Sequence, residues 1–252
     1  MTKLYLPRNI FSKIFATEIQ SKTEINVEFL HSSLIARRLI EDQNSIGLMP
    51  SLDLLTNKDL FVSSRIGITF DALLSNSYIH FKEEQKTIEE IFLKGEVSSN
   101  EVILSKILFK EFYGITVKTT LLSQEPPDFD ENILIVGDEN FEREMFLNGL
   151  SFSEEVIEMI GAPYVNFVLA GLSEDIVKNF NSEYDDVFKN GHKENFSQLL
   201  PELPQTSLDF ISVNIQHVIF DFDEQDLEAI KLLLQMPYYH GLLKEMIEVK
   251  FV

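Results

Sequence analysis

The chain contains no cysteine, no long apolar run and few cationic side chains. The lack of cysteine excludes a disulfide scaffold, thiolate catalysis and zinc–thiolate sites. No apolar run reaches the roughly 18 residues that a membrane-spanning helix needs, so membrane insertion is not expected. The 21 Lys and Arg residues face 41 Asp and Glu residues, which gives a formal net charge of −20. A field of that sign repels nucleic-acid backbones and anionic membranes, so we expect neither as a partner.

The first fifteen residues also lack the apolar core of a signal peptide. Lys3, Arg8, Asn9 and Lys13 interrupt any apolar run of about 7–15 residues. Provided that the native chain starts here, we interpret the protein as cytoplasmic. The remaining composition is that of a globular protein, since 44% of the 252 residues are hydrophobic and 25% are charged. This length suffices for one large domain or two smaller lobes with a real core.

Apolar periodicity predicts alternating strands and helices at the start of the chain. The expected strands are 3–6, 25–30 and 44–48, and the expected helices between them are 9–19 and 31–41. Two β-α units in succession favour an α/β sheet.

The middle of the chain has strands and a helix of its own. The helix is 98–113, the strands are 66–70, 77–81, 116–122, 133–136 and 164–170, the acidic segment 83–93 is expected to be partly helical, and 123–132 is expected to be a loop. The segment after 173 is mostly helical in pattern. A chain that enters a second lobe and later returns would show this order.

Ser98 begins the pattern Ser-x-x-Glu immediately before the clearest apolar helix stripe. This spacing is typical of a capping box, in which Ser98 and Glu101 satisfy backbone amides of the first turn. The alternative is a seat for a ligand anion, because amides and hydroxyls at a helix N-terminus bind carboxylate or phosphate. The charge of Glu101 counts against an anion at the same place.

Recognised catalytic motifs are absent. The five histidines have no metal-ligand spacing, and there is no glycine-rich nucleotide motif or nucleophile elbow. We therefore expect no metal and no cofactor. The acidic pairs that occur are interpreted as solvated loops in a chain this acidic.

Five segments, in order, resemble chorismate dehydratase, an enzyme of the futalosine route of menaquinone biosynthesis. They are N-S-I-G-L-M-P-S-L-D-L-L with I-G-I (44–55, 66–68), N-S-Y-I-H-F (76–81), S-S-N-E-V (98–102), I-V-G-D (135–138) and G-A-P-Y-V (161–165). The resemblance implies a two-lobed α/β fold, the type 2 periplasmic-binding-protein-like fold, with a ligand cleft between the lobes. It also implies boundaries: 1–72 plus 168–252 for one lobe, 73–167 for the other, with crossings near 69–75 and 163–170.

The resemblance implies site residues as well. Ser77 matches a catalytic serine of the family, whereas Pro7 stands where the family has a catalytic asparagine, for which Asn9 is the nearby substitute. Substrate-binding residues are expected at positions that match the family's motifs or that supply a nearby cation or hydroxyl. They are Arg8, His31, Ser32, Ser33, Asn76, Ser98, Ser99, Asn100, Gly137, Asp138 and Tyr164.

Three functions stay open on this basis. The first is a hydro-lyase that removes water from chorismate to give an enolpyruvyl benzoate. The second is a non-catalytic protein of the same fold that binds a small organic ligand, and it is favoured by the departures from the family at Pro7 and Glu101. The third is a divergent enzyme acting on a related aromatic precursor. A dehydratase needs two facing anion seats, whereas a binder of an uncharged ligand needs an apolar pocket.

Overall fold

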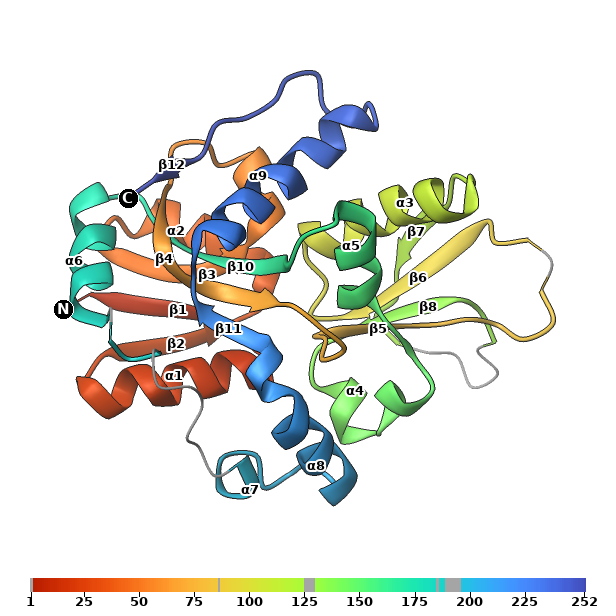
Figure 1. Ribbon diagram of the computed structural model, residues 1–252, viewed down its shortest axis with the longest axis horizontal. Coiled ribbons are helices and arrows are strands. Elements are labelled where there is room, and N and C mark those ends of the chain that lie inside the picture. The colour runs from red at the N-terminus through yellow and green to blue at the C-terminus, as the bar shows by residue number, and fades with distance from the viewer. Residues whose placement is uncertain (1, 86, 125–129, 185, 189–195) are drawn as a thin grey trace.

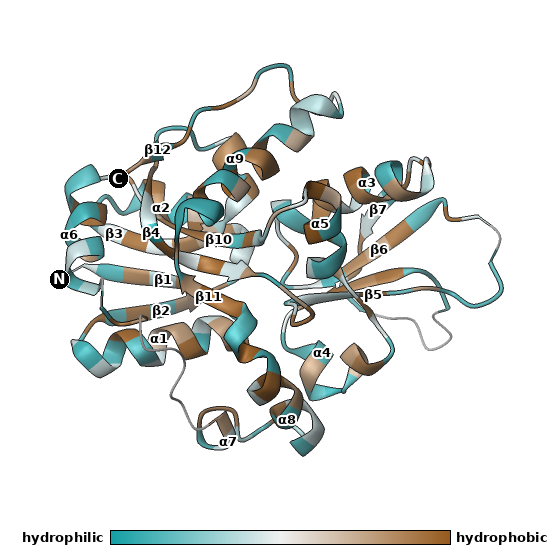
Figure 2. Cartoon of the chain, in the orientation of Figure 1, coloured by the Kyte–Doolittle hydropathy of each residue, from teal (hydrophilic) through white to brown (hydrophobic). Residues whose placement is uncertain are grey.

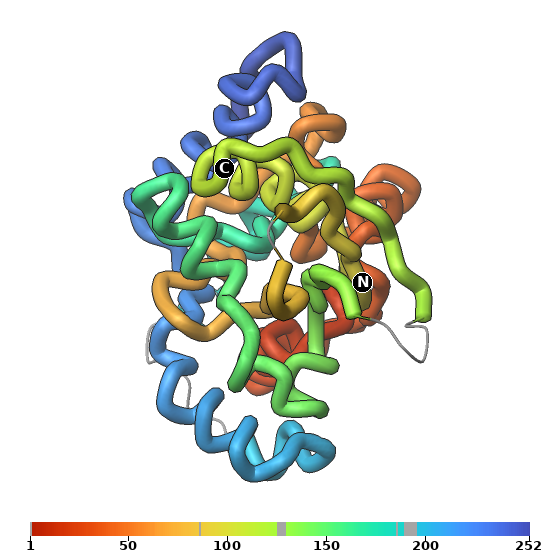
Figure 3. The backbone as a smooth tube through the Cα atoms, turned by 90° about the vertical axis from the view of Figure 1, so that its right-hand side faces the viewer, coloured from red at the N-terminus to blue at the C-terminus, as the bar shows by residue number. Residues whose placement is uncertain are grey.

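The computed structural model describes residues 2–85, 87–124, 130–184, 186–188 and 196–252. Its strands form two separate sheets, which lie side by side along the long axis of the molecule (Figure 1). We call the part built on the seven-stranded sheet the larger lobe and the part built on the five-stranded sheet the smaller lobe. Seen from the end of the molecule (Figure 3), the yellow and green segments of the smaller lobe lie in front of the rest.

The larger sheet combines strands from both ends of the chain. Its order is β11 (Val218–Asp221), β4 (Phe61–Phe70), β10 (Tyr164–Gly171), β3 (Ser45–Pro50), β1 (Lys3–Pro7) and β2 (Asn26–Leu30), and β12 (Lys250–Phe251) also pairs with β4. β1 runs parallel to β2 and β3, as β-α units require, and the predicted early strands are confirmed. β10 inserts antiparallel between β3 and β4, so the returning chain joins the first sheet.

Helices and short turns complete the larger lobe. They are α1 (Ile10–Lys22), η1 (Ser32–Leu34), α2 (Ile35–Glu41), η2 (Ser51–Leu55), α6 (Glu174–Tyr184), α7 (Phe196–Leu199), α8 (Gln205–Asn214), η4 (Ile215–His217) and α9 (Glu224–Tyr239). The strands of both sheets are largely hydrophobic, whereas exposed helix faces are hydrophilic (Figure 2). Apolar burial of this kind supplies most of the stabilising free energy of a domain. No helix of the described residues is long and apolar enough to cross a membrane.

The smaller sheet is formed by consecutive middle segments. Its order is β7 (Lys118–Leu121), β6 (Glu90–Gly95), β8 (Ile133–Val136), β5 (Ser77–His80) and β9 (Leu150–Ser151), and its helices are α3 (Ser99–Tyr113), α4 (Glu139–Glu142), η3 (Met145–Leu147) and α5 (Phe152–Ile160). The predicted helix ending near Tyr113 is confirmed, and Gly114 ends it in the left-handed region with φ of 67°.

The two-lobed fold expected from the sequence is confirmed, with differences in detail. The boundary expected at 167/168 falls inside β10, which pairs along its length with β3 and β4 and therefore belongs to the larger sheet. The partly helical pattern expected for 83–93 is wrong at its end, because Glu90–Gly95 forms strand β6 between β7 and β8. Tertiary pairing overrides the weak local propensity there. Part of the loop expected at 123–132 lies outside the described residues.

Candidate functional site

A pocket of about 580 Å³ lies at the junction of the two lobes. Its lining comes from the ends of β2 and β6, the N-terminal half of α3, and the end of β7: His31, Ser33, Leu93, Gly95, Val97, Ser98, Ser99, Val102, Ile103, Leu121, Leu122 and Ser123. Among the described residues, none with a carboxylate, ammonium or guanidinium group lines it. The pocket is therefore mainly apolar, with hydroxyls and one imidazole as its polar groups.

The N-terminus of α3 borders this pocket, and its first turn is closed by its own side chains. The Ser98 backbone amide donates to Glu101 Oε2 at 2.8 Å, and the Ser98 hydroxyl donates to the same oxygen at 2.7 Å. The Asn100 amide donates to Ser98 Oγ at 3.2 Å. The capping box predicted from the sequence is thus confirmed. Glu101 is buried, and this burial raises the pKa of its carboxyl.

His31 and Ser33 bring the larger lobe to the same pocket. His31 follows β2, and its Nδ1 lies 2.9 Å from Ser33 Oγ. Its Nε2 lies 3.4 Å from the carbonyl oxygen of Gly95 at the end of β6. The imidazole therefore reaches from the larger to the smaller lobe at the pocket edge.

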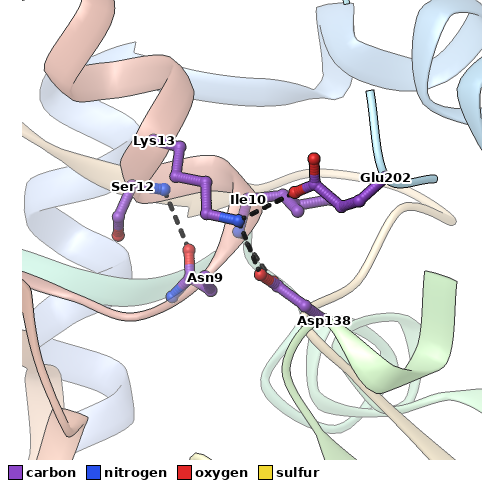
Figure 4. A network of polar contacts seen from close by, with 6 residues as sticks. All are labelled: Asn9, Ile10, Ser12, Lys13, Asp138 and Glu202. Carbon is purple, nitrogen blue, oxygen red and sulfur yellow. Dashed lines mark hydrogen bonds and ion pairs between the residues drawn. The ribbon is translucent and has the colours of Figure 1, made fainter. Parts of the chain in front are cut away.

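The other side of the junction, at the N-terminus of α1, is filled by protein groups (Figure 4). Asn9 caps the helix, because its Oδ1 accepts from the Ser12 amide at 2.9 Å. Asp138 of the smaller lobe accepts from the Ile10 amide at 2.8 Å and from Lys13 Nζ at 3.3 Å. Burial raises the pKa of Asp138, and the Lys13 ammonium opposes that shift.

A second carboxylate crosses the junction at the turn after β2. Glu96 Oε2 accepts from the Ser32 amide at 3.1 Å, and the Ser32 hydroxyl lies 3.5 Å from the same oxygen. Ser32 is buried, and these contacts give its amide an acceptor from the smaller lobe. An anion seat expected at Ser32 is therefore occupied by the side chain of Glu96.

Asn100 links the lobes through its amide group. Its Oδ1 accepts from the Leu52 amide at 2.9 Å, and its Nδ2 donates to the carbonyl oxygen of Asn166 at 2.7 Å. The Tyr164 hydroxyl, fully buried, donates to Asn166 Oδ1 at 3.2 Å. The two hydrogen bonds of Asn100 therefore tie α3 of the smaller lobe to η2 and β10 of the larger lobe.

The expected catalytic Ser77 lies at the first crossing between the lobes. Ser77 is 1% exposed, and its amide donates to Ser75 Oγ at 3.1 Å. The neighbouring Asn76 carbonyl accepts from the Gly137 amide at 2.7 Å. Gly137 has a φ of 100°, a backbone conformation that favours glycine. The side-chain amide of Asn76 is buried and has no hydrogen-bond partner within the described part of the chain. Arg8 is exposed and donates to the carbonyl of Phe29 at 3.3 Å.

The pocket gathers four of the residues that the sequence singled out, namely His31, Ser33, Ser98 and Ser99. The remaining ones do not line it: Arg8, Asn9, Ser32, Asn76, Ser77, Asn100, Gly137, Asp138 and Tyr164. Their catalytic and binding roles stay predictions. Sequence reasoning also missed two carboxylates at the junction, Glu96 and Asp53. Burial raises the pKa of Asp53 from 3.8 to about 6, and the neighbouring Ser99 hydroxyl opposes the shift.

Two signals in the sequence pointed toward those carboxylates. Asp53 lies within the segment 44–55 that resembles the known family, and Glu96 lies two residues before the Ser98 cap. Neither position predicts the partner of the carboxylate, because Ser99 is far from Asp53 along the chain and Ser32 is far from Glu96.

Solved structures of low sequence identity share this fold. Protein AF1704 from Archaeoglobus fulgidus superposes with a TM-score of 0.67 at 12% identity, covering 96% of this chain and 98% of its own. A ligand binding component of an ABC-type import system from Staphylococcus aureus gives 0.63 at 12% identity, covering 100% and 95%. The periplasmic aliphatic sulphonate binding protein SsuA from Escherichia coli gives 0.61 at 9% identity, covering 99% and 90%. No family model and no curated protein matches the chain.

These similarities define the class of fold. The chain has the two-lobed α/β fold of periplasmic solute-binding proteins, which is the fold that the resemblance to chorismate dehydratase implies. At 9–12% identity the similarity shows the fold and no activity.

Proposed function

We propose that this protein binds a small, uncharged and largely apolar organic molecule in the junction pocket and does not catalyse a reaction on it. The observation that carries the proposal is the lining of the 580 Å³ pocket, which contains no Asp, Glu, Lys or Arg among the described residues. A desolvated carboxylate needs a paired cation or several donors. The cytoplasmic location remains part of the proposal.

The protein's own carboxylates support this choice of ligand. Asp138, Glu96 and Glu101 accept from the amides at the ends of α1, η1 and α3, where a dianionic ligand would need donors. Two structurally similar proteins are described as binding proteins for sulphonates, and another was solved with methionine bound. A small ligand bound between the lobes is consistent with those proteins, but the ligand proposed here is uncharged, whereas a sulphonate is an anion.

A chorismate dehydratase is the second candidate function. It is favoured by the ordered series of motifs and by Ser77, which keeps a catalytic position of the family. Two observations weigh against it: Pro7 stands at the family's asparagine, and the side-chain oxygen of the nearby Asn9 is used to cap α1.

The test is a calorimetric and thermal-shift comparison of methyl benzoate and benzoate, which differ mainly in charge, with chorismate as a third and larger ligand. We expect methyl benzoate, or a larger neutral aromatic ester, to bind most tightly. At about 100 times its Kd, a ligand raises the unfolding free energy by about 2.7 kcal/mol. Ile103→Trp should weaken this binding at least about tenfold, because the larger side chain fills part of the pocket. A tenfold change corresponds to a loss of only about 1.4 kcal/mol in binding free energy.

Lys110→Trp is the matched control, because Lys110 is exposed on the same helix and does not line the pocket. Ultraviolet loss of chorismate is measured alongside. Turnover of chorismate that disappears in Ser77→Ala would replace this proposal with the dehydratase, and tight binding of chorismate without turnover would refute the uncharged ligand.

A further inference from the structure

Carboxylates of the smaller lobe accept hydrogen bonds from backbone amides at the N-terminal turns of α1 and η1 in the larger lobe. Asp138 accepts from the Ile10 amide, and Glu96 accepts from the Ser32 amide. Amides at these positions have no acceptor within their own helix. In a two-lobed protein, such amides at the junction can be satisfied by water, by a ligand or by the opposite lobe. Here the opposite lobe supplies the acceptors.

An aromatic contact crosses the junction on the α1 side. Phe146 in η3 of the smaller lobe stacks on Phe210 in α8 of the larger lobe, with ring centroids 4.4 Å apart and planes inclined by 22°. One turn earlier on α8, the Ser207 hydroxyl donates to the carbonyl of Phe141 at 2.6 Å. The helix α8 therefore extends below the larger sheet to meet α4 and η3 (Figure 1).

We propose that these contacts form a clasp that keeps the two lobes closed in the absence of ligand. The clasp consists of three contacts. Glu96 accepts from the Ser32 amide, Asp138 accepts from the Ile10 amide and from Lys13, and Phe146 stacks on Phe210. Each contact joins the larger to the smaller lobe, and none requires a bound molecule.

The clasp changes what a ligand can do. A ligand shifts a conformational equilibrium only by its difference in affinity for the two states. Where the protein's own side chains already favour the closed state, binding leaves the relative position of the lobes unchanged. Entry to the junction pocket then needs no lobe movement, because Ser33, Leu121 and Ser123 of its lining are exposed to solvent.

The distance between the lobes can be measured directly because the chain has no cysteine. Gln20→Cys on α1 and Lys110→Cys on α3 place spin labels on exposed positions, one in each lobe, for double electron–electron resonance without ligand. The clasp variant is Glu96→Ala, Asp138→Ala and Phe210→Ala together. We expect one narrow distance distribution for the unmodified protein, and a longer, broader one for the clasp variant.

The matched control also removes two carboxylates and one aromatic ring, but each of its contacts stays within one lobe. It combines Glu41→Ala, which loses Arg37, Glu174→Ala, which loses Lys178, and Phe81→Ala, which loses Phe109. We expect the narrow distribution of the unmodified protein. Circular dichroism checks that both variants are folded. Should the alanine variant unfold, Glu96→Gln, Asp138→Asn and Phe210→Leu replace it and should broaden the distribution to a smaller extent.

Two results would overturn the proposal. One is a folded clasp variant with the same narrow distribution as the control. The other is an unmodified protein that already shows a broad distribution. Both measurements are made without ligand, so they are independent of which molecule occupies the pocket and of whether the proposed function is right.

Discussion

The N-termini of α1 and α3 face the same junction, and each receives a carboxylate in a different way. At α1 the carboxylate is Asp138 from the other lobe, 128 residues away along the chain. At α3 it is Glu101 from the first turn of the same helix. The first arrangement joins the lobes, whereas the second satisfies α3 locally and leaves the adjacent 580 Å³ pocket unfilled.

The comparison shows how a very acidic chain can keep an uncharged pocket. Helix N-termini carry a partial positive charge that favours carboxylates. In a protein of net charge −20, acidic side chains are available to occupy these positions. At both helix N-termini, amides that could bind an anion are therefore satisfied by carboxylates of the protein itself. A ligand with a carboxylate would have to displace one of the protein's own.

The largest expected effect tests the α1 side of this comparison. Phe11 is fully buried, and its ring lies 5.0 Å from Phe70 of the larger lobe and 6.0 Å from Phe141 of the smaller lobe. Phe11→Ala should lower the free energy of unfolding by about 3–5 kcal/mol, because it leaves a cavity between the lobes. Urea unfolding measures this. Phe112→Ala, at an exposed position of α3, is the control and should cost less than about 1 kcal/mol. Equal losses in the two variants would contradict tight aromatic packing at the α1 side.

The second prediction concerns Asp53 on the α3 side. Burial raises the pKa of this carboxyl from 3.8 to about 6. Because the folded state binds the proton more tightly than the unfolded state, the stability of the protein falls as pH rises from about 4 to 6. Asp53→Asn removes this cost. The variant should be more stable than the unmodified protein at pH 7.5, by about 3 kcal/mol at most, and of similar stability at pH 3.5.

Measurement of this difference requires urea unfolding at several pH values, since other groups titrate in the same range. The control is Asp59→Asn, whose side chain is 94% exposed, and its stability difference should be close to zero at every pH. A difference at Asp53 that stays constant with pH would rule out the raised pKa as its cause.

Local patterns in the sequence predict most of the early strands and the long helix of the middle segment, but not strand β6. The strand at 3–6, the helix stripe at 98–113 and the cap at Ser98 are all set by neighbouring residues, and the structure has them. The order of motifs added the two-lobed fold. β6 was missed because its pairing with β7 and β8 forms between segments that are distant in sequence.

The candidate site was less predictable for the same reason. The hydrogen bonds from Ile10 to Asp138 and from Ser32 to Glu96 join residues 128 and 64 positions apart. Nothing in the local sequence shows which acidic residue of 41 will occupy which helix end. The capping box predicted that Glu101 satisfies the first turn of α3, but no local pattern shows that Asp138 and Glu96 do the same for the amides of Ile10 and Ser32.

The smallest effect is expected at Ser98, where the cap of α3 meets the pocket. Ser98→Ala removes the acceptor of the Asn100 amide and one donor to Glu101, and should cost about 1–2 kcal/mol of unfolding free energy. Ser98→Thr keeps the hydroxyl and should cost less than about half of this. Affinity for a neutral aromatic ester should change little in either variant, because the apolar lining is unaltered. A large loss of affinity in Ser98→Ala, restored in Ser98→Thr, would instead make the hydroxyl a ligand contact and assign a polar group of the ligand to this end of the pocket.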